Sequence, residues 1–361
     1  MSRYLEVQQA SSTAPKRWLV TGCAGFIGSH LTESLLRQGQ QVVGLDNFST
    51  GYQRNLDDVA ARVGAQAFAR FRFLKGDIRD PSTCASATQG VDLVLHQAAL
   101  GSVPRSMKDP QSSHASNVDG FVNVLLAAHA AGVKRVVYAS SSAVYGDEAA
   151  QPKVEERIGR PLSPYATTKL VDEIYADTLR RTHGIESVGL RYFNVFGPRQ
   201  DPNGAYAAVI PRWTQRLIDG EPCVVFGDGS SSRDFCYVEN IVQANLLAAL
   251  APTEDVALGV FNIACGASTS LLQLFERLRD LVARDRAAAR DAQLQHDPLR
   301  PGDIPHSLAS VDRARDRLGY APTHDVTRGL AETVTWYLAQ TPARAPIPGT
   351  AAAFHPTHEA P

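Results

Sequence analysis

The sequence has few cysteines, no surplus of charge of either sign and no long apolar run. Its five cysteines are scattered and never form a Cys-x-x-Cys pair, which argues against a zinc site or a disulfide framework and favours a reduced compartment. We interpret them as small buried apolar residues. The 36 basic and 37 acidic side chains give a net charge of −1, so no basic field attracts nucleic acid or an anionic membrane.

Hydrophobic patterning excludes several classes of protein. No apolar run approaches the roughly 18 residues that a membrane-spanning helix needs, and the mean hydropathy is −0.18. Residues 1–16 are polar and lack the apolar core of a signal peptide. A hydrophobic content of 44% with 20% charged residues excludes disorder, collagen and coiled coil. We therefore expect a soluble, cytoplasmic protein whose 361 residues form two domains, or one large domain with an appendage.

Short buried strands alternate with helices along the first half of the chain. Apolar runs predict strands at 18–21, 42–45, 71–74, 93–95, 136–138 and 187–192. Helical patterns lie between them at 25–39, 111–131 and 165–182. This alternation is typical of an α/β protein with a doubly wound parallel sheet.

After residue 193 the pattern becomes irregular, because glycine and proline are frequent and short strands interrupt the helices. Helices are expected at 207–219, 239–250 and 271–284. The expected organisation is an amino-terminal extension (1–16), a Rossmann domain to which parts of the later chain return (17–193), a smaller mixed α/β domain (194–340), and a disordered tail rich in proline and alanine (341–361).

A glycine-rich turn joins the first strand to the first helix of this pattern. Gly22, Gly25 and Gly28 each remove a Cβ, where the chain must turn sharply, approach a pyrophosphate and pack the helix close to the sheet. The helix amino terminus then presents free N–H groups to phosphate. Asp46, at the end of the second strand, can accept both ribose hydroxyls and repel the extra phosphate of NADP. The pattern predicts NAD binding rather than an ordinary strand–helix turn.

Tyr165 and Lys169 are four residues apart, which places them on one face of a predicted helix. A free phenol has a pKa of about 10 and is a poor base at neutral pH. A nearby ammonium and an oxidised nicotinamide both favour phenolate, and lowering the pKa by about 3 units requires about 4 kcal/mol. Considered alone, this spacing is typical of two exposed side chains that interact on a helix surface. In a chain that also carries an NAD-binding motif, it indicates a catalytic base.

A serine-rich segment that includes Ser141 and Ser142 follows the strand at 136–138. The carboxyl ends of parallel strands lie over the cofactor crevice. A serine hydroxyl there can pass a proton between a substrate hydroxyl and the tyrosine. The alternative is a serine-rich turn without a catalytic role.

Together, these motifs resemble those of extended short-chain dehydrogenases/reductases that act on nucleotide sugars. The resemblance covers residues 17–340 and includes the glycine turn, the serine-rich strand end, the Tyr-x-x-x-Lys motif and the segment 190–198. Within that family, residues 95–106 and 199–211 are most similar to UDP-N-acetylglucosamine 4-epimerases of bacterial surface-polysaccharide synthesis. Related dehydratases carry an Asp-Glu pair where this chain has Ser142 and Ala143, which disfavours dehydration.

The resemblance implies roles for individual residues and implies no metal. Ser141 would relay protons, Tyr165 would act as the base, and Lys169 would support the base and anchor the cofactor ribose. The residues implied to bind NAD are Gly22, Gly25, Phe26, Ile27, Gly28, Asp46, Asn47, Ser49, Thr50, Gly51, Asp77, Ile78, Gln97, Ala98, Ala99, Tyr165, Lys169 and Tyr192.

A second implied set binds the UDP-sugar. Arg233 and Arg300 match diphosphate-binding arginines, whose planar guanidinium donates two hydrogen bonds at once. Relatives restricted to non-acetylated sugars tend to carry tyrosine where this chain has Ser307. Pro305 departs from the basic or polar residue expected just before His306-Ser307. The other residues implied to contact substrate are Gly101, Ser102, Ser141, Ser142, Asn194, Gln200, Ala208, Val209 and Asp303.

The implied activity is NAD-dependent 4-epimerisation between UDP-GlcNAc and UDP-GalNAc, extending to UDP-Glc and UDP-Gal, through a transient 4-keto sugar. The helices at 111–131 and 165–182 resemble those that form a four-helix homodimer interface in relatives. One alternative is an epimerase or decarboxylase for another nucleotide sugar such as UDP-glucuronate, although we identify no groups that would position a carboxylate for decarboxylation. Another is a non-catalytic NAD-binding scaffold, which the retained Tyr165 and Lys169 disfavour.

Overall fold

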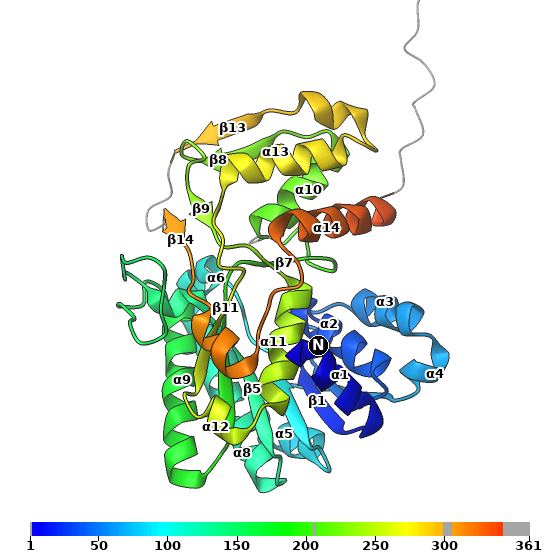
Figure 1. The fold of residues 1–361 in the computed structure, drawn as a ribbon, viewed down its shortest axis with the longest axis vertical. Coiled ribbons are helices and arrows are strands. Elements are labelled where there is room, and N and C mark those ends of the chain that lie inside the picture. Colours follow the sequence, from blue (N-terminus) through cyan, green and yellow to red (C-terminus); the bar gives the residue numbers. More distant parts are fainter. Residues whose placement is uncertain (1, 205–206, 299–304, 342–361) are drawn as a thin grey trace, which may run out of the picture.

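The computed structural model describes residues 2–204, 207–298 and 305–341 (Figure 1). The large sheet of the described chain is parallel throughout, in the order β11-β6-β5-β4-β1-β2-β3. Its strands are β1 (Arg17–Thr21), β2 (Gln41–Asp46), β3 (Phe71–Lys75), β4 (Leu93–His96), β5 (Arg135–Ser141), β6 (Ser187–Tyr192) and β11 (Val260–Ile263). The predicted α/β class with a doubly wound parallel sheet is confirmed.

Helices cover both faces of this sheet. The helices of this part of the chain are α2 (Phe26–Arg37), α3 (Gln53–Val63), α4 (Ala65–Phe68), α5 (Pro81–Thr88), α6 (Val103–Lys108), α7 (Pro110–His114), α8 (Gly120–Ala130), α9 (Pro164–His183), α11 (Val238–Leu250) and α12 (Thr253–Val256). Because side chains alternate along a strand, Val20 packs with residues of α2 and α11, whereas Leu19 packs with residues of α5 and α8. Two layers of helices therefore enclose the sheet.

A smaller region lies beyond the carboxyl ends of the strands, in the upper part of Figure 1. Its apolar core includes Trp213, Phe275 and Leu330. Its elements are β7 (Val195–Phe196), α10 (Val209–Asp219), β8 (Cys223–Phe226), β9 (Ser232–Arg233), β10 (Cys236–Tyr237), β12 (Thr269–Ser270), α13 (Leu271–Val282), β13 (Leu294–Asp297), β14 (His306–Ser307) and α14 (Val326–Gln340). The division at residue 194 stays a prediction, and α11 and β11 return to the large sheet.

Capping residues explain where helix α9 begins and ends. Ser163 caps α9 by accepting the Ala166 N–H at 3.1 Å, Pro164 occupies its first turn, and Gly184 ends it with a φ of 69°. The predicted strand 187–192 coincides with β6. The predicted helix 111–131 consists of α7, a π-helical turn at Ala115–Asp119, and α8.

The amino-terminal extension forms a helix, α1 (Arg3–Thr13), which the sequence analysis did not predict. Tyr4 and Val7 pack against the main core, and the Gln40 side chain donates to the Ser11 carbonyl at 2.9 Å. Among the described helices, none combines the length and apolarity needed to cross a membrane. The predicted tail lies outside the described residues except for Thr341.

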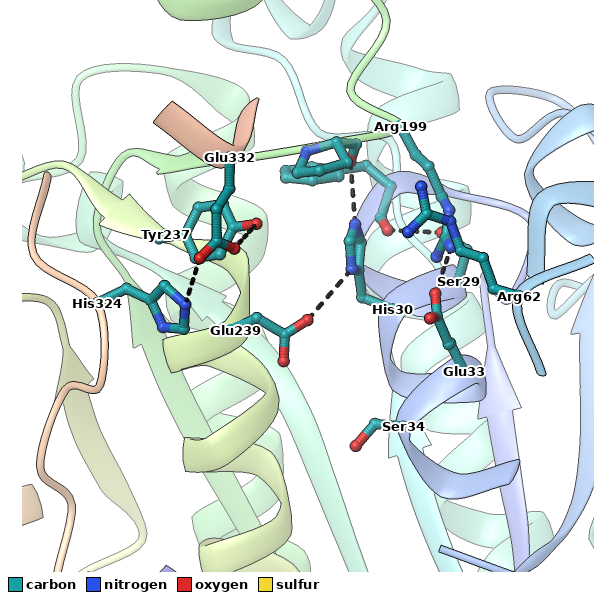
Figure 2. A network of polar contacts seen from close by, with 12 residues as sticks. Ser29, His30, Glu33, Ser34, Arg62, Arg199, Tyr237, Glu239, His324 and Glu332 are labelled. Atoms are coloured by element: carbon teal, nitrogen blue, oxygen red, sulfur yellow. Dashed lines mark hydrogen bonds and ion pairs between the residues drawn. The ribbon is translucent and has the colours of Figure 1, made fainter. Parts of the chain in front are cut away.

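A polar network fastens α2 to the chain that follows β7 (Figure 2). The buried guanidinium of Arg199 donates to Glu33 of α2 and, at 2.6 Å from its Nε, to Asp58 of α3. Burial opposes ionisation of Glu33, but Arg199 overcomes this and holds the pKa of Glu33 below its ordinary value. This ion pair therefore stabilises the fold at neutral pH, and the contribution is lost as the pH falls through that lowered pKa.

Replacing Arg199 by methionine should lower the free energy of unfolding by about 2 to 4 kcal/mol, because Glu33 and Asp58 then share no buried cation. Arg37→Met is the matched control: Arg37 also contacts Glu33, but its side chain is 52% exposed, and its loss should cost under about 0.5 kcal/mol. Urea unfolding at neutral pH measures both values. Equally small losses in the two variants would contradict this account of the network.

Candidate active site

The glycine turn lies where β1 ends and α2 begins. A Cβ on Gly28 would lie 2.0 Å from the Gly22 carbonyl oxygen, and a Cβ on Gly22 would lie 2.8 Å from the Ala98 nitrogen. Gly22 also has a φ of 69°, which favours glycine. Gly25 precedes α2 without a capping side chain, so the first N–H groups of α2, including those of Phe26 and Ile27, are available to an anion. This cradle fits the pyrophosphate of the expected NAD.

Asp46 ends β2 beside this turn and is buried. Its Oδ2 accepts the Ala24 N–H at 2.9 Å, and its Oδ1 accepts the Phe48 N–H at 2.8 Å. Burial raises the pKa of Asp46, while these backbone donors oppose the rise. The carboxylate thus holds the glycine turn against β2, and its remaining lone pairs can accept ribose hydroxyls.

Other residues expected to bind NAD lie on the loops that follow β2 and β3. Asn47 donates to Asp77 at 2.8 Å and accepts the Ser49 N–H at 2.9 Å. A hydrogen bond from Arg79 holds the pKa of Asp77 well below its ordinary value. Of the remaining expected residues, Gly51 packs against Ala24, Ile78 is buried beneath Gly120 of α8, and Thr50 is exposed.

A closed polar triad lies between β4, β6 and α11. The Tyr192 hydroxyl donates to Gln97 at 3.2 Å and accepts from Asn245 at 2.8 Å, while the Gln97 amide donates to Asn245 at 3.2 Å. Burial raises the pKa of Tyr192 far above its ordinary value, so this phenol stays protonated. The next residue, Ala98, donates its N–H to Thr21 Oγ1 at 3.2 Å, and Ala99 continues this loop. The triad thus fixes the chain that leaves β4.

The expected catalytic residues come from α9 and from the end of β5. Tyr165 is half-buried in the first turn of α9, and its backbone N–H donates to Ser106 Oγ at 3.0 Å. Lys169 lies one turn further on and is buried. Ser141 ends β5, where its Oγ accepts the Ala143 N–H at 3.1 Å and caps the short 3₁₀ turn Ser142–Tyr145, which lies against α9.

Asn117 is a buried residue that the sequence analysis missed. It lies in the π-helical turn, where its Oδ1 accepts the Leu100 N–H at 2.7 Å and its Nδ2 donates to the Leu100 carbonyl at 3.3 Å. The same amide donates to Thr168 Oγ1 of α9 at 3.0 Å. Asn117 therefore connects the loop after β4 to the helix that carries Tyr165. A π-helical turn often marks a functional position, but the helical pattern in the sequence concealed it.

The expected substrate residues come from several loops and from the starts of helices. Ser102 caps α6 by accepting the Arg105 N–H at 3.1 Å and follows the exposed Gly101. Asn194 has a φ of 34° and donates to the Asp234 carbonyl at 3.1 Å. Gln200 donates to the Val195 carbonyl at 3.3 Å. Of the other expected residues, Ala208 directly precedes α10 and Val209 begins it, while Arg300 and Asp303 lie outside the described residues.

The segment that carries Ser307 pairs with β9, although Pro305 departs from the residue type expected there. Strand β14 pairs in parallel with β9 and sets Ser307 opposite Arg233. The Pro305 carbonyl accepts the Ser232 N–H at 2.9 Å and Nη1 of Arg233 at 3.0 Å. Proline lacks an N–H but keeps its carbonyl, so Pro305 joins the loop to β9 rather than displacing it.

Asp234 anchors this loop to the large sheet, and the sequence analysis did not single it out. The buried carboxylate accepts N–H groups from Cys265 at 2.9 Å, Gly266 at 3.0 Å and Ala309 at 3.3 Å. Burial raises the pKa of Asp234 to about 6, although the three backbone donors oppose the rise. Asp234 thereby joins the chain after β11 to the segment after β14.

The cysteines form no disulfide, and four of them are buried as expected. Cys265 is the exception, because it is only partly buried. It lies at the carboxyl end of β11, where Asn240 and the His324 carbonyl surround its thiol. Within the described ranges, no group of His, Cys, Asp and Glu side chains could hold a metal ion.

Comparisons with known proteins identify relatives that match almost the whole chain. A family model described as NAD dependent epimerase/dehydratase family matches residues 18–264. A UDP-glucose 4-epimerase of Mycolicibacterium smegmatis is 37% identical over 323 residues, covering 89% of this chain and 98% of the relative.

Two solved structures extend the comparison. A UDP-N-acetylglucosamine 4-epimerase from Methanobrevibacter ruminantium M1, in complex with UDP-N-acetylmuramic acid, is 37% identical, has a TM-score of 0.82, and matches 91% of this chain and 99% of its own. A UDP-glucuronic acid 4-epimerase from Bacillus cereus, in complex with UDP-glucuronic acid and NAD, is 29% identical, has a TM-score of 0.80, and matches 90% and 100%.

Proposed function

We propose that this chain, which belongs to the NAD dependent epimerase/dehydratase family, interconverts UDP-N-acetylglucosamine and UDP-N-acetylgalactosamine by inverting carbon 4 of the sugar. The observation that carries this proposal is the spacing of Tyr165 and the buried Lys169 one turn apart on α9, a helix that packs on β5 and β6. The absence of a carboxylate pair at Ser142 and Ala143 favours epimerisation over dehydration.

The chain's own residues would move one proton in each half of the reaction. NAD, when bound, accepts a hydride from sugar carbon 4 and returns it, which is redox chemistry that no side chain supplies. Tyr165 takes the proton of the 4-hydroxyl, directly or through Ser141, and later gives it back. Lys169 stabilises the charge that develops on the phenol and holds the cofactor ribose. Between the two halves, the 4-keto sugar must turn over within the site.

For the 4-keto sugar to turn over within the site, the protein must bind UDP tightly and the sugar loosely. Arg233 is our proposed diphosphate ligand, since its guanidinium lies beside β14 and suits a bidentate phosphate contact. Arg300 and Asn194 are the other proposed ligands of UDP. Gly101, Ser102, Ser142 and Ser307 are small, which supports a pocket with room for an acetamido group.

A second candidate is the 4-epimerisation of UDP-glucuronate. It is favoured by the likeness to the Bacillus cereus UDP-glucuronic acid 4-epimerase and by a UDP-glucuronate 4-epimerase of Arabidopsis thaliana that is 34% identical over 339 residues. The same residues would also serve the interconversion of UDP-Glc and UDP-Gal. A panel of UDP-GlcNAc, UDP-glucose and their uronates discriminates among these substrates.

We also propose a homodimer formed through α8 and α9, working in the cytoplasm to supply sugar donors for polysaccharide synthesis. Support for the dimer comes from large apolar side chains that stay exposed on these helices, with Leu126 43% and Ile174 57% exposed. Sedimentation of the purified protein measures its oligomeric state directly.

The central test is incubation of the purified protein with UDP-GlcNAc and no added cofactor. We expect UDP-GalNAc to form, with NAD bound to the protein. Tyr165→Phe should lose about 100- to 10,000-fold in kcat and keep its nucleotide, because only the proton acceptor is removed. Tyr175→Phe, on the exposed side of the same helix, is the control and should retain activity. Full activity of Tyr165→Phe would refute the proposed base.

Ser307→Tyr should reduce kcat/KM for UDP-GlcNAc by about 10- to 100-fold and spare UDP-glucose, because the ring would fill the proposed acetamido pocket. His306→Tyr adds the same ring to the opposite side of β14 and serves as the matched control. Both substrates are measured for each variant. Unchanged turnover of UDP-GlcNAc by Ser307→Tyr would contradict the pocket.

A further inference from the structure

Asp172 lies on the catalytic helix at a position that neither the motifs nor the comparisons single out. It follows Lys169 by three residues, which puts both side chains on the sheet-facing side of α9. Asp172 is 0% exposed and Lys169 is 3% exposed. The Lys169 ammonium donates to Asp172 Oδ2 at 3.1 Å. Within the described part of the chain, Asp172 Oδ1 has no hydrogen-bond partner.

The other ionisable groups near Lys169 and Asp172 either have partners of their own or are uncharged. Glu173, the next residue of α9, forms an ion pair with Arg191 of β6 at 2.8 Å and accepts from Ser140 of β5 at 2.5 Å. Burial, aided by the Lys169 charge, lowers the pKa of His96 of β4 to about 3, so its imidazole is neutral. Burial likewise raises the pKa of Tyr138 of β5 well above its ordinary value. Asp172 is therefore the carboxylate available to Lys169.

A buried ammonium is costly unless an acceptor or a counter-charge lies beside it. An ammonium has three N–H groups, of which Asp172 accepts one. The contact holds the lysine side chain against α9 and leaves its other N–H groups for further acceptors. Burial raises the pKa of Asp172 to about 7, although Lys169 opposes the rise. The carboxyl can therefore change its charge close to neutral pH.

On the basis of the proposed 4-epimerase function, we propose that Asp172 is a positioning residue that holds the Lys169 ammonium beside Tyr165 and offsets part of its charge. The carboxylate and the ammonium act on the phenol with opposite signs. When Asp172 is ionised, less of the lysine's positive potential reaches Tyr165; when it is neutral, more of it does. The charge of Asp172 thus sets the pH at which the base becomes active.

Asp172→Asn tests this proposal because it keeps an oxygen acceptor for Lys169 and removes the negative charge. We expect the acidic limb of the kcat/KM profile to move to lower pH by about one unit. NAD bound per chain and the melting temperature should stay close to those of the parent protein. Asp177→Asn is the matched control, since Asp177 lies on the same helix but pairs with Arg180 and Arg181 at the surface; its profile should not move.

Asp172→Ala provides the second variant, since it removes the acceptor as well as the charge. We expect it to lower both kcat and the amount of NAD that purifies with the protein. An acidic limb in Asp172→Asn that stays in place, or moves to higher pH, would overturn the proposal. So would a lower melting temperature with an unchanged profile, which indicates a structural role alone. If the parent protein turns over no UDP-sugar, the proposed function itself fails, and the two failures are thereby distinguished.

Discussion

The contact between Gly22 and Gly28 is the constraint on which the rest of the site depends. Because a Cβ on Gly28 would lie 2.0 Å from the Gly22 carbonyl oxygen, α2 can start against the end of β1 only if position 28 is glycine. The amino terminus of α2 then points over the carboxyl edge of the sheet. Asp46 holds the same turn through the Ala24 N–H, and Arg199 holds α2 from its other side. Without this close approach, no anion cradle would exist at this edge.

The second half of the site is α9, which is fixed to its surroundings mainly by buried polar contacts. Ser106 accepts the Tyr165 N–H, Asn117 binds Thr168, and Arg191 pairs with Glu173. These partners come from α6, the π-helical turn and β6, so the helix is held from several directions. The base takes a proton from the sugar and returns it after the sugar has turned over in the site. A rigid helix keeps the base in the same position for both halves of the reaction.

Local patterns in the sequence predicted the parts of the molecule that depend on neighbouring residues. The glycine turn, the strand 187–192 and the Tyr165–Lys169 pair are each determined within about ten residues, so periodicity and spacing were sufficient. Helix α14 could also have been predicted, because Leu330, Val334 and Tyr337 follow the spacing of a buried helical face. The assignment of individual residues to NAD and substrate remains a prediction.

The residues that sequence reasoning missed depend on distant partners. Asn117 binds Leu100 and Thr168, and Asp234 binds backbone groups from two separate segments. Helix α1 has few apolar residues and depends on packing against the core. Asp172 looks like any polar residue of a helix until its burial next to Lys169 is known. In each case the sequence gives the residue type but not the neighbour that determines its role.

The most direct measurement of the central claim is the origin of the hydrogen on carbon 4 of the product. The reaction is run in deuterium oxide, and the isolated UDP-sugars are examined by NMR. If Tyr165 handles only the hydroxyl proton, while the hydrogen on carbon 4 leaves and returns without exchange, the inverted carbon carries no deuterium. Deuterium at that carbon would show that the hydrogen passes through a group in exchange with solvent, and would contradict the account.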